Sequence, residues 1–140
     1  MTEVVILNGG NLADTVFTLD ARFLGEEITW NVTRLQDAAD RGEFQKITLS
    51  MAFVADTDWE SGNVSRDRVD KIKGTPHALA LPVILIENEP HRPYRFLCFV
   101  DGQHRITARQ ELRLKDFEAY VVPHDVEKRY RIIEQRVTLP

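Results

Sequence analysis

The stretch Phe99–Arg105, which reads Phe-Val-Asp-Gly-Gln-His-Arg, decides how the rest of this sequence is interpreted. The residues before it, from Tyr94 to Val100, are apolar and aromatic, which is typical of a buried strand. After it, apolar residues recur with helical spacing and predict a helix with one buried face: Ile106, Ala108, Leu112 and Leu114. The stretch therefore forms the turn between a strand and a helix.

This turn carries five different chemical groups in a row: Asp101, Gly102, Gln103, His104 and Arg105. A helix that begins here directs unpaired backbone N–H groups and the positive end of its dipole at the turn, an arrangement that suits a phosphate. Gly102 allows a sharp turn and a close approach of a ligand, and Arg105 can donate two hydrogen bonds to phosphate oxygens. In a purely structural alternative, Asp101 caps the helix while His104 and Arg105 only pack.

The pentapeptide Asp-Gly-Gln-His-Arg resembles the signature of the ParB/sulfiredoxin-like superfamily, which includes the N-terminal domain of the partition protein ParB, sulfiredoxin and free serine kinases. The resemblance runs from about Arg66 to about Pro123 and includes the expected strands Pro82–Ile86 and Phe117–Val122. It implies an α/β (α+β) fold with a small mixed sheet and flanking helices. It also implies binding of a nucleoside triphosphate, ATP or CTP, with Gly102, Gln103, His104 and Arg105 at the phosphates.

The resemblance places further nucleotide-binding residues on a helix that Ser65 is expected to cap. In sulfiredoxins the matching short helix contributes a basic residue, a hydroxyl and a threonine. The corresponding positions here are Arg68, Lys71 and Thr75, of which Lys71 departs from the sulfiredoxin pattern. The alternative for Arg68 and Lys71 is an exposed helix face without a ligand.

The motif of this chain differs from the motifs of two branches of the superfamily, and these differences argue against the activities of those branches. Sulfiredoxin has a cysteine directly before the His-Arg pair, where this chain has Gln103, and Cys98 falls in a predicted buried strand. Sulfinic acid reduction is therefore not expected. ParB proteins carry a Glu-Arg-Arg version of the loop, and no helix-turn-helix pattern follows the motif here, which argues against a ParB-type DNA clamp. The kinase-like members share an acidic residue and a glycine before His-Arg.

An acidic loop precedes the helix that should border the nucleotide. It spans residues 56–63 and contains Asp58 and Glu60 on either side of Trp59. These carboxylates could hold Mg²⁺, and one of them could act as a general base. The alternative is a solvated turn, which Asp, Gly and Asn favour for backbone reasons.

The composition is that of an ordinary globular protein, with 43% hydrophobic and 29% charged residues and a net charge of −4. Residues 1–70 carry 6 Lys and Arg against 13 Asp and Glu, whereas residues 71–140 carry 12 against 9. The weakly basic second half fits a phosphate ligand but gives little support for a nucleic acid partner. No apolar run is long enough for a membrane span, and no secretory signal pattern is present. With a single cysteine, a cytoplasmic setting is expected.

We expect one domain over residues 1–140 with three parts. Residues 1–43 form an N-terminal elaboration, in which strands Thr2–Asn8 and Thr15–Leu19 pair as a hairpin and Glu26–Arg41 forms a helix capped by Thr29 or Asn31. Residues 44–123 form the family core, beginning with a strand over Phe44–Ala55. Residues 124–140 form a basic C-terminal helix, which packs on the domain, makes a homodimer contact or touches nucleic acid.

Three candidate functions follow from these patterns. The first is a nucleoside triphosphate-binding domain that hydrolyses the nucleotide or transfers a phosphoryl group, as an NTPase or small-molecule kinase. In it Asp101 contacts a ribose, a metal or the phosphoryl acceptor, and His104 and Arg105 act at the phosphates. Glu60 or Asp58 is the base. The second is a non-catalytic module of plasmid or phage type that binds a protein or DNA. The third is a metal-dependent nuclease that uses the acidic loop.

Overall fold

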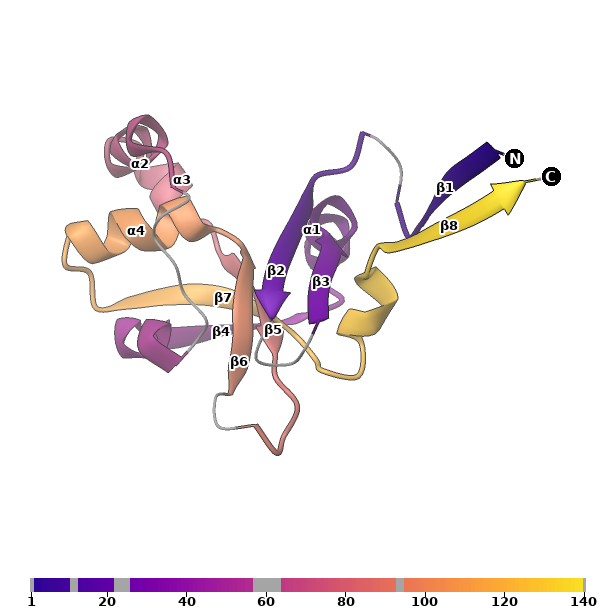
Figure 1. Cartoon of the computed structure of the whole chain (residues 1–140). Coiled ribbons are helices and arrows are strands. Elements are labelled where there is room, and N and C mark those ends of the chain that lie inside the picture. Colours follow the sequence, from indigo (N-terminus) through magenta and orange to yellow (C-terminus); the bar gives the residue numbers. More distant parts are fainter. Residues whose placement is uncertain (1, 11–12, 22–25, 57–63, 93–94, 140) are drawn as a thin grey trace.

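The computed structural model describes residues 2–10, 13–21, 26–56, 64–92 and 95–139 of the chain. Its strands are β1 (Thr2–Asn8), β2 (Val16–Ala21), β3 (Glu26–Asn31), β4 (Gln45–Ser50), β5 (Val83–Glu87), β6 (Phe96–Asp101), β7 (Asp116–Val122) and β8 (Ile133–Leu139). Its helices are α1 (Val32–Asp40), α2 (Arg66–Lys73), α3 (Pro76–Ala80) and α4 (Gln103–Glu111), with 3-10 turns η2 (Met51–Asp56) and η3 (Glu127–Tyr130). The expectation of mixed helices and strands is confirmed (Figure 1).

The centre of the molecule is a four-stranded mixed sheet in the order β4-β7-β5-β6. β5 runs parallel to β7 and antiparallel to β6, and β4 runs antiparallel to β7. The continuous apolar sequence of β5 suits its inner position, because a strand covered on both faces has no polar side. The consecutive strands β5 and β6 pair as an antiparallel hairpin.

Each face of this sheet is covered by its own cluster of apolar side chains. Val83 and Leu85 of β5 belong to one cluster, together with Ile106 of α4. Ile84 and Ile86 belong to the other, which includes Trp30, Leu35 and Ala38 from β3 and α1. Successive residues of a strand point to opposite faces, so β5 contributes side chains to both clusters, as β6 and β7 also do. The sheet therefore lies between a layer that contains α4 and a layer that contains β3 and α1.

The N-terminal elaboration contains a hairpin and a helix, but not the pair of strands that the sequence predicts. β2 pairs with β3, in the register Phe17 opposite Trp30, whereas β1 pairs with β8. The first half of the helix expected over Glu26–Arg41 is strand β3, and α1 begins only at Val32. Asn31 is the N-cap, as one of the two predicted candidates, and its side chain accepts a hydrogen bond from the Arg34 N–H.

The helix expected over residues 124–140 is wrong. The chain forms the short turn η3 and then strand β8, which pairs along its whole length with β1. The two strands form a ribbon that carries both ends of the described chain away from the central sheet (Figure 1). The buried Glu127 explains why η3 stays in place: it accepts hydrogen bonds from Trp30 Nε1 at 2.6 Å and from Arg131.

Two smaller expectations are also corrected. The strand expected over Phe44–Ala55 ends at Ser50, and the next six residues form the 3-10 turn η2. Leu112 and Leu114 do not lie on the buried face of α4, because the helix ends at Glu111 and Arg113 turns the chain with a φ of 55°. Both leucines are exposed. In the described part of the chain, no helix is long and apolar enough to cross a membrane.

Candidate functional site

The site is built where β6 ends and α4 begins. Gly102 is the N-cap of α4 and adopts the left-handed conformation with a φ of 99°, which residues other than glycine rarely tolerate. A Cβ at this position would lie 2.4 Å from Val83 Cγ1 of the adjacent strand β5. The glycine is thus required by the turn itself and by the close packing of the turn on the sheet.

Among the residues that the structure describes, no side chain caps the N-terminus of α4, whose N-cap is Gly102. The part of the structural alternative in which Asp101 caps this helix is therefore wrong, because Gly102 is the N-cap and Asp101 contacts Arg105 instead. The first N–H groups of an α-helix have no partner within the helix, and here a side chain does not supply one. The positive end of the helix dipole is left facing the space in front of Gly102.

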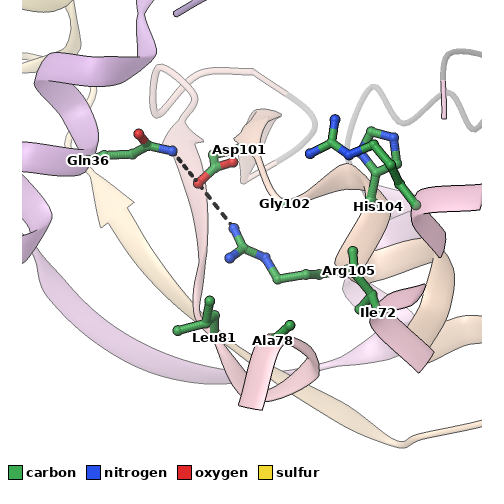
Figure 2. A pocket seen from close by; sticks show the side chains of 9 residues that line it. Gln36, Ile72, Ala78, Leu81, Asp101, Gly102, His104 and Arg105 are labelled. Carbon is green, nitrogen blue, oxygen red and sulfur yellow. Dashed lines mark hydrogen bonds and ion pairs between the residues drawn. The ribbon is translucent and has the colours of Figure 1, made fainter. Parts of the chain in front are cut away.

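That space is a cavity of about 190 Å³. Its walls come from the motif loop, from α2 and α3, and from α1 across the sheet: Gln36, Arg68, Ile72, Ala78, Leu81, Asp101, Gly102, His104 and Arg105. Figure 2 shows Arg105 reaching from α4 across the cavity toward Asp101, with Leu81 and Ala78 on the opposite side. We call it the first cavity.

Arg105 is held in place by Asp101. One Nη of Arg105 lies 3.1 Å from Oδ2 of Asp101, and the same oxygen accepts a hydrogen bond of 3.1 Å from the side-chain amide of Gln36 (Figure 2). Both charged side chains are largely buried, at 15% and 27% exposed. Asp101 therefore orients the guanidinium and ties it to α1. A guanidinium has five N–H donors, so this contact leaves others for a ligand.

His104 faces the beginning of α2. Its Nε2 accepts a hydrogen bond of 3.0 Å from the backbone N–H of Ser65, the N-cap of that helix. Burial, and secondarily the nearby charge of Arg68, lower the pKa of His104 from its ordinary value of 6.5. The ring is therefore neutral at pH 7, and because Nε2 accepts, Nδ1 carries the proton. His104 thus lines the first cavity and links α4 to the beginning of α2.

The structure brings some of the predicted ligand residues together and places others elsewhere. Arg68 lines the first cavity, together with the Asp101, Gly102, His104 and Arg105 group. Gln103 turns back toward the sheet and donates a hydrogen bond to the carbonyl of Phe99, so its side chain lies outside the cavity lining. Lys71 and Thr75 also lie outside the lining, and the Thr75 hydroxyl donates to the carbonyl of Lys71.

The position of α2 against α4 is fixed by a charged cluster on the surface. Glu111 of α4 forms ion pairs with Arg66 at 2.7 Å and with Lys73 at 3.0 Å, both from α2. The hydrogen bonds from these two side chains lower the pKa of Glu111 to about 2. Since Arg68 and Ile72 belong to the same helix, this cluster helps to hold them beside α4.

Four lining residues were not among the sequence candidates. They are Gln36, Ile72, Ala78 and Leu81. Ile72, Ala78 and Leu81 carry no signal that separates them from packing residues. Gln36 is the more informative omission, because it comes from the N-terminal elaboration, which the family resemblance leaves unexplained. Only the pairing of α1 with this side of the sheet brings it to Asp101.

The acidic loop cannot be placed. Asp58 and Glu60 lie outside the described residues, so their predicted roles in binding Mg²⁺ and in proton transfer stay predictions. Across residues 2–10, 13–21, 26–56, 64–92 and 95–139, no group of three or more His, Cys, Asp or Glu side chains is arranged to hold a metal ion. Cys98 is buried, as predicted.

We find no protein-family model, no curated protein and no solved structure that matches this chain. The function is therefore inferred from the geometry and chemistry of the site and from the motif that forms it.

Proposed function

We propose that the chain binds a nucleoside triphosphate, ATP or CTP, with its phosphates in the first cavity, and that it is a cytoplasmic member of the ParB/sulfiredoxin-like superfamily. The observation that carries the proposal is the uncapped N-terminus of α4, which faces a cavity lined by Arg68, His104 and Arg105. Helix N-termini and arginine side chains are both well suited to binding phosphate groups. The motif's position between a strand and a helix supports the family assignment.

The charges of the first cavity favour an anion. Two guanidiniums and one carboxylate line it, and His104 adds a neutral donor because its pKa is lowered. Asp101 neutralises part of Arg105 but also prevents the side chain from leaving the cavity. An arginine held in this way loses little conformational entropy when it binds a phosphate. We assign Arg105 as the main phosphate ligand and Asp101 as the residue that positions it.

The size of the first cavity restricts what lies inside it. At about 190 Å³ it is smaller than the roughly 300–1,000 Å³ of sites that enclose a whole drug-sized ligand. It suits the phosphate groups, so the nucleoside must lie outside it.

The proposed reaction is hydrolysis or phosphoryl transfer. Arg105 lies where it can stabilise negative charge that develops on the transferred phosphoryl group, a contribution that dominates catalysis of such reactions. Mg²⁺ would enter with the triphosphate, and its charge would offset that of the phosphates. Asp58 and Glu60 are proposed as its ligands, with Glu60 as the base. Changing either residue should abolish turnover with little effect on triphosphate binding measured without metal.

A thermal-shift panel tests the proposal. The wild-type chain is melted with ATP, CTP, GTP and UTP, each with and without Mg²⁺, beside Arg105→Ala and the control Arg34→Ala. Arg34 is an exposed arginine on α1 that lies outside the cavity lining. A ligand that binds only the folded state raises Tm by mass action. One triphosphate should stabilise the wild type and Arg34→Ala but not Arg105→Ala; equal stabilisation of all three proteins would contradict the proposal.

The 3.1 Å contact between Asp101 and Arg105 favours a second candidate, a non-catalytic domain that binds a protein or DNA. In this case the ion pair between Asp101 and Arg105 stabilises the fold and binds no ligand. Arg105→Ala would then lower the Tm of the ligand-free protein by several degrees, and no triphosphate would bind at millimolar concentration. The panel above separates the two candidates directly.

A further inference from the structure

A second cavity lies against the same ion pair. Its volume is about 280 Å³, and it shares Gln36, Leu81, Asp101 and Arg105 with the first cavity. It extends away from α2 and is completed by Ala39, Asp40, Pro82, Ile84 and Tyr120. The Asp101–Arg105 pair and the Gln36 amide therefore line both cavities; α2 contributes residues only to the first, and Asp40 of α1 lines only the second.

The chemistry of the second cavity is opposite to that of the first. Two carboxylates, Asp40 and Asp101, line it against one guanidinium, and Arg105 is already paired with Asp101. Among the residues that the structure describes, no side chain forms an ion pair with Asp40. A cation entering this cavity would gain an attraction to both carboxylates, whereas an anion would be repelled.

The remaining surface of the second cavity is largely apolar. Leu81, Pro82, Ile84 and Ala39 line it, and the half-buried Tyr120 adds an aromatic ring. The four aliphatic side chains among them offer a bare inorganic cation no oxygen ligand. A short carbon chain would bury apolar surface on them. The cavity thus combines an acidic wall with an apolar one.

We propose that the second cavity binds a small organic amine, and that this amine and the phosphate ligand of the first cavity strengthen each other's binding. The ammonium group pairs with Asp40 and Asp101, and the carbon chain lies on Leu81 and Pro82. The binding of the amine rests on the second cavity alone. The coupling rests also on the proposed function, because it requires an anion in the first cavity.

The ion pair between the cavities explains the coupling. A phosphate that binds Arg105 weakens the attraction between Arg105 and Asp101, which leaves more of the Asp101 charge for an ammonium group. An ammonium group that binds Asp101 likewise leaves more donors of Arg105 for the phosphate. Each ligand therefore weakens the attraction between Asp101 and Arg105, so the other ligand loses less binding free energy in competing with it. By thermodynamic linkage the two effects are equal in size, and the lower end of the usual range is about fivefold in affinity.

Three probes of one shape test the amine site. Propylamine, propan-1-ol and propionate differ chiefly in charge, and each is titrated into the full chain while the backbone amide signals are followed by NMR. Propylamine should shift the signals of Asp40, Tyr120 and Asp101, whereas the alcohol and the acid should shift them at least tenfold less at equal concentration. Absence of propylamine shifts at tens of millimolar would overturn the proposal, as would equal shifts from all three probes.

Two carboxylate variants on α1 provide the matched control. Asp40→Asn removes a charge from the cavity wall, and Asp37→Asn removes one from an exposed position outside the lining. We expect Asp40→Asn to weaken propylamine binding about tenfold, with Asp37→Asn within twofold of the wild type and both Tm values unchanged. Equal effects of the two variants would show only a general surface attraction and would overturn the assignment.

The coupling is measured by titrating the best triphosphate with and without saturating propylamine. We expect about fivefold tighter triphosphate binding with the amine, and no such gain in Asp101→Asn. If the two ligands exclude each other, the nucleoside occupies the second cavity and the amine proposal is overturned. If propylamine binds but no triphosphate does, the amine site stands while the coupling and the proposed function fall.

Discussion

The two cavities share one ion pair and differ in the helix that closes each of them. α2 brings Arg68 to the first cavity, where the uncapped end of α4 adds its own positive potential. α1 brings Asp40 to the second cavity, whose lining includes neither Gly102 nor His104. The comparison shows that one strand-to-helix turn presents opposite chemistry on its two sides, because its neighbours come from different parts of the chain.

Gly102→Ala should damage both cavities at once and have the largest effect. The new Cβ would lie 2.4 Å from Val83 Cγ1 in a backbone conformation with a φ of 99°. We expect a loss of about 2–4 kcal/mol in the free energy of unfolding, from overpacking and backbone strain together. Urea unfolding measures it.

Gly42→Ala is the control for this loss. Gly42 also has a positive φ, at 77°, but nothing lies within 4 Å of its added Cβ. Gly42→Ala should therefore lower the free energy of unfolding by about 1 kcal/mol, from the unfavourable backbone conformation alone. Equal losses in the two variants would show that Val83 yields easily and that the turn is not tightly packed.

Arg68→Gln should separate the two cavities. Arg68 lines only the first cavity, so triphosphate binding should weaken while propylamine binding stays unchanged. Because Arg68 is exposed, we expect a modest loss, about 0.5–1 kcal/mol or two- to fivefold in Kd. Calorimetry measures it, with Lys71→Gln, one turn away and outside the lining, as the control. A loss in propylamine binding as large as that in triphosphate binding would remove the distinction between the cavities.

The smallest effect concerns pH. Because the pKa of His104 is lowered on folding, the unfolded chain binds more protons below the ordinary value of 6.5. This residue should therefore make the protein less stable as the pH falls below 6.5, and protonation should also break its bond with the Ser65 N–H. Urea unfolding between pH 5 and pH 8, on the wild type and on His104→Asn, measures the dependence. A variant with the same slope as the wild type would contradict it.

His124 provides a control of opposite sign. A hydrogen bond with Glu87, at 2.9 Å, raises the pKa of His124 above 6.5. Its contribution to stability should be complete below pH 6.5 and should be lost as the pH rises through the raised pKa. His124→Gln should therefore change the slope above pH 6.5, whereas His104→Asn changes it below pH 6.5.

The central part of the molecule could be predicted because its signals are local. β5 is a continuous apolar run, Ser65 caps α2, and the turn between β6 and α4 contains the glycine that its left-handed backbone requires. Each of these features depends on residues within about ten positions of one another. The resemblance to a known family pointed to the same stretch.

The parts that failed depend on distant partners. The spacing of Ile28 and Val32 fits both a helix and a strand. The spacing of apolar residues alone therefore does not reveal that β3 ends at Asn31 and that α1 begins at Val32. β8 lies in a basic segment that pairs with the other end of the chain, and no local pattern predicts such a partner. The same limit hid Gln36 and Asp40, which reach their cavities only because α1 packs on the sheet.

Calorimetric titration of the best triphosphate into the wild type and Arg105→Ala tests the central claim most directly. The loss of charge-assisted hydrogen bonds should weaken binding by about 1.5–3 kcal/mol, roughly ten- to 150-fold in Kd. The Tm of the ligand-free variant should stay close to that of the wild type, with Arg34→Ala binding normally. Equal affinities of wild type and Arg105→Ala would contradict the claim that this turn holds phosphate.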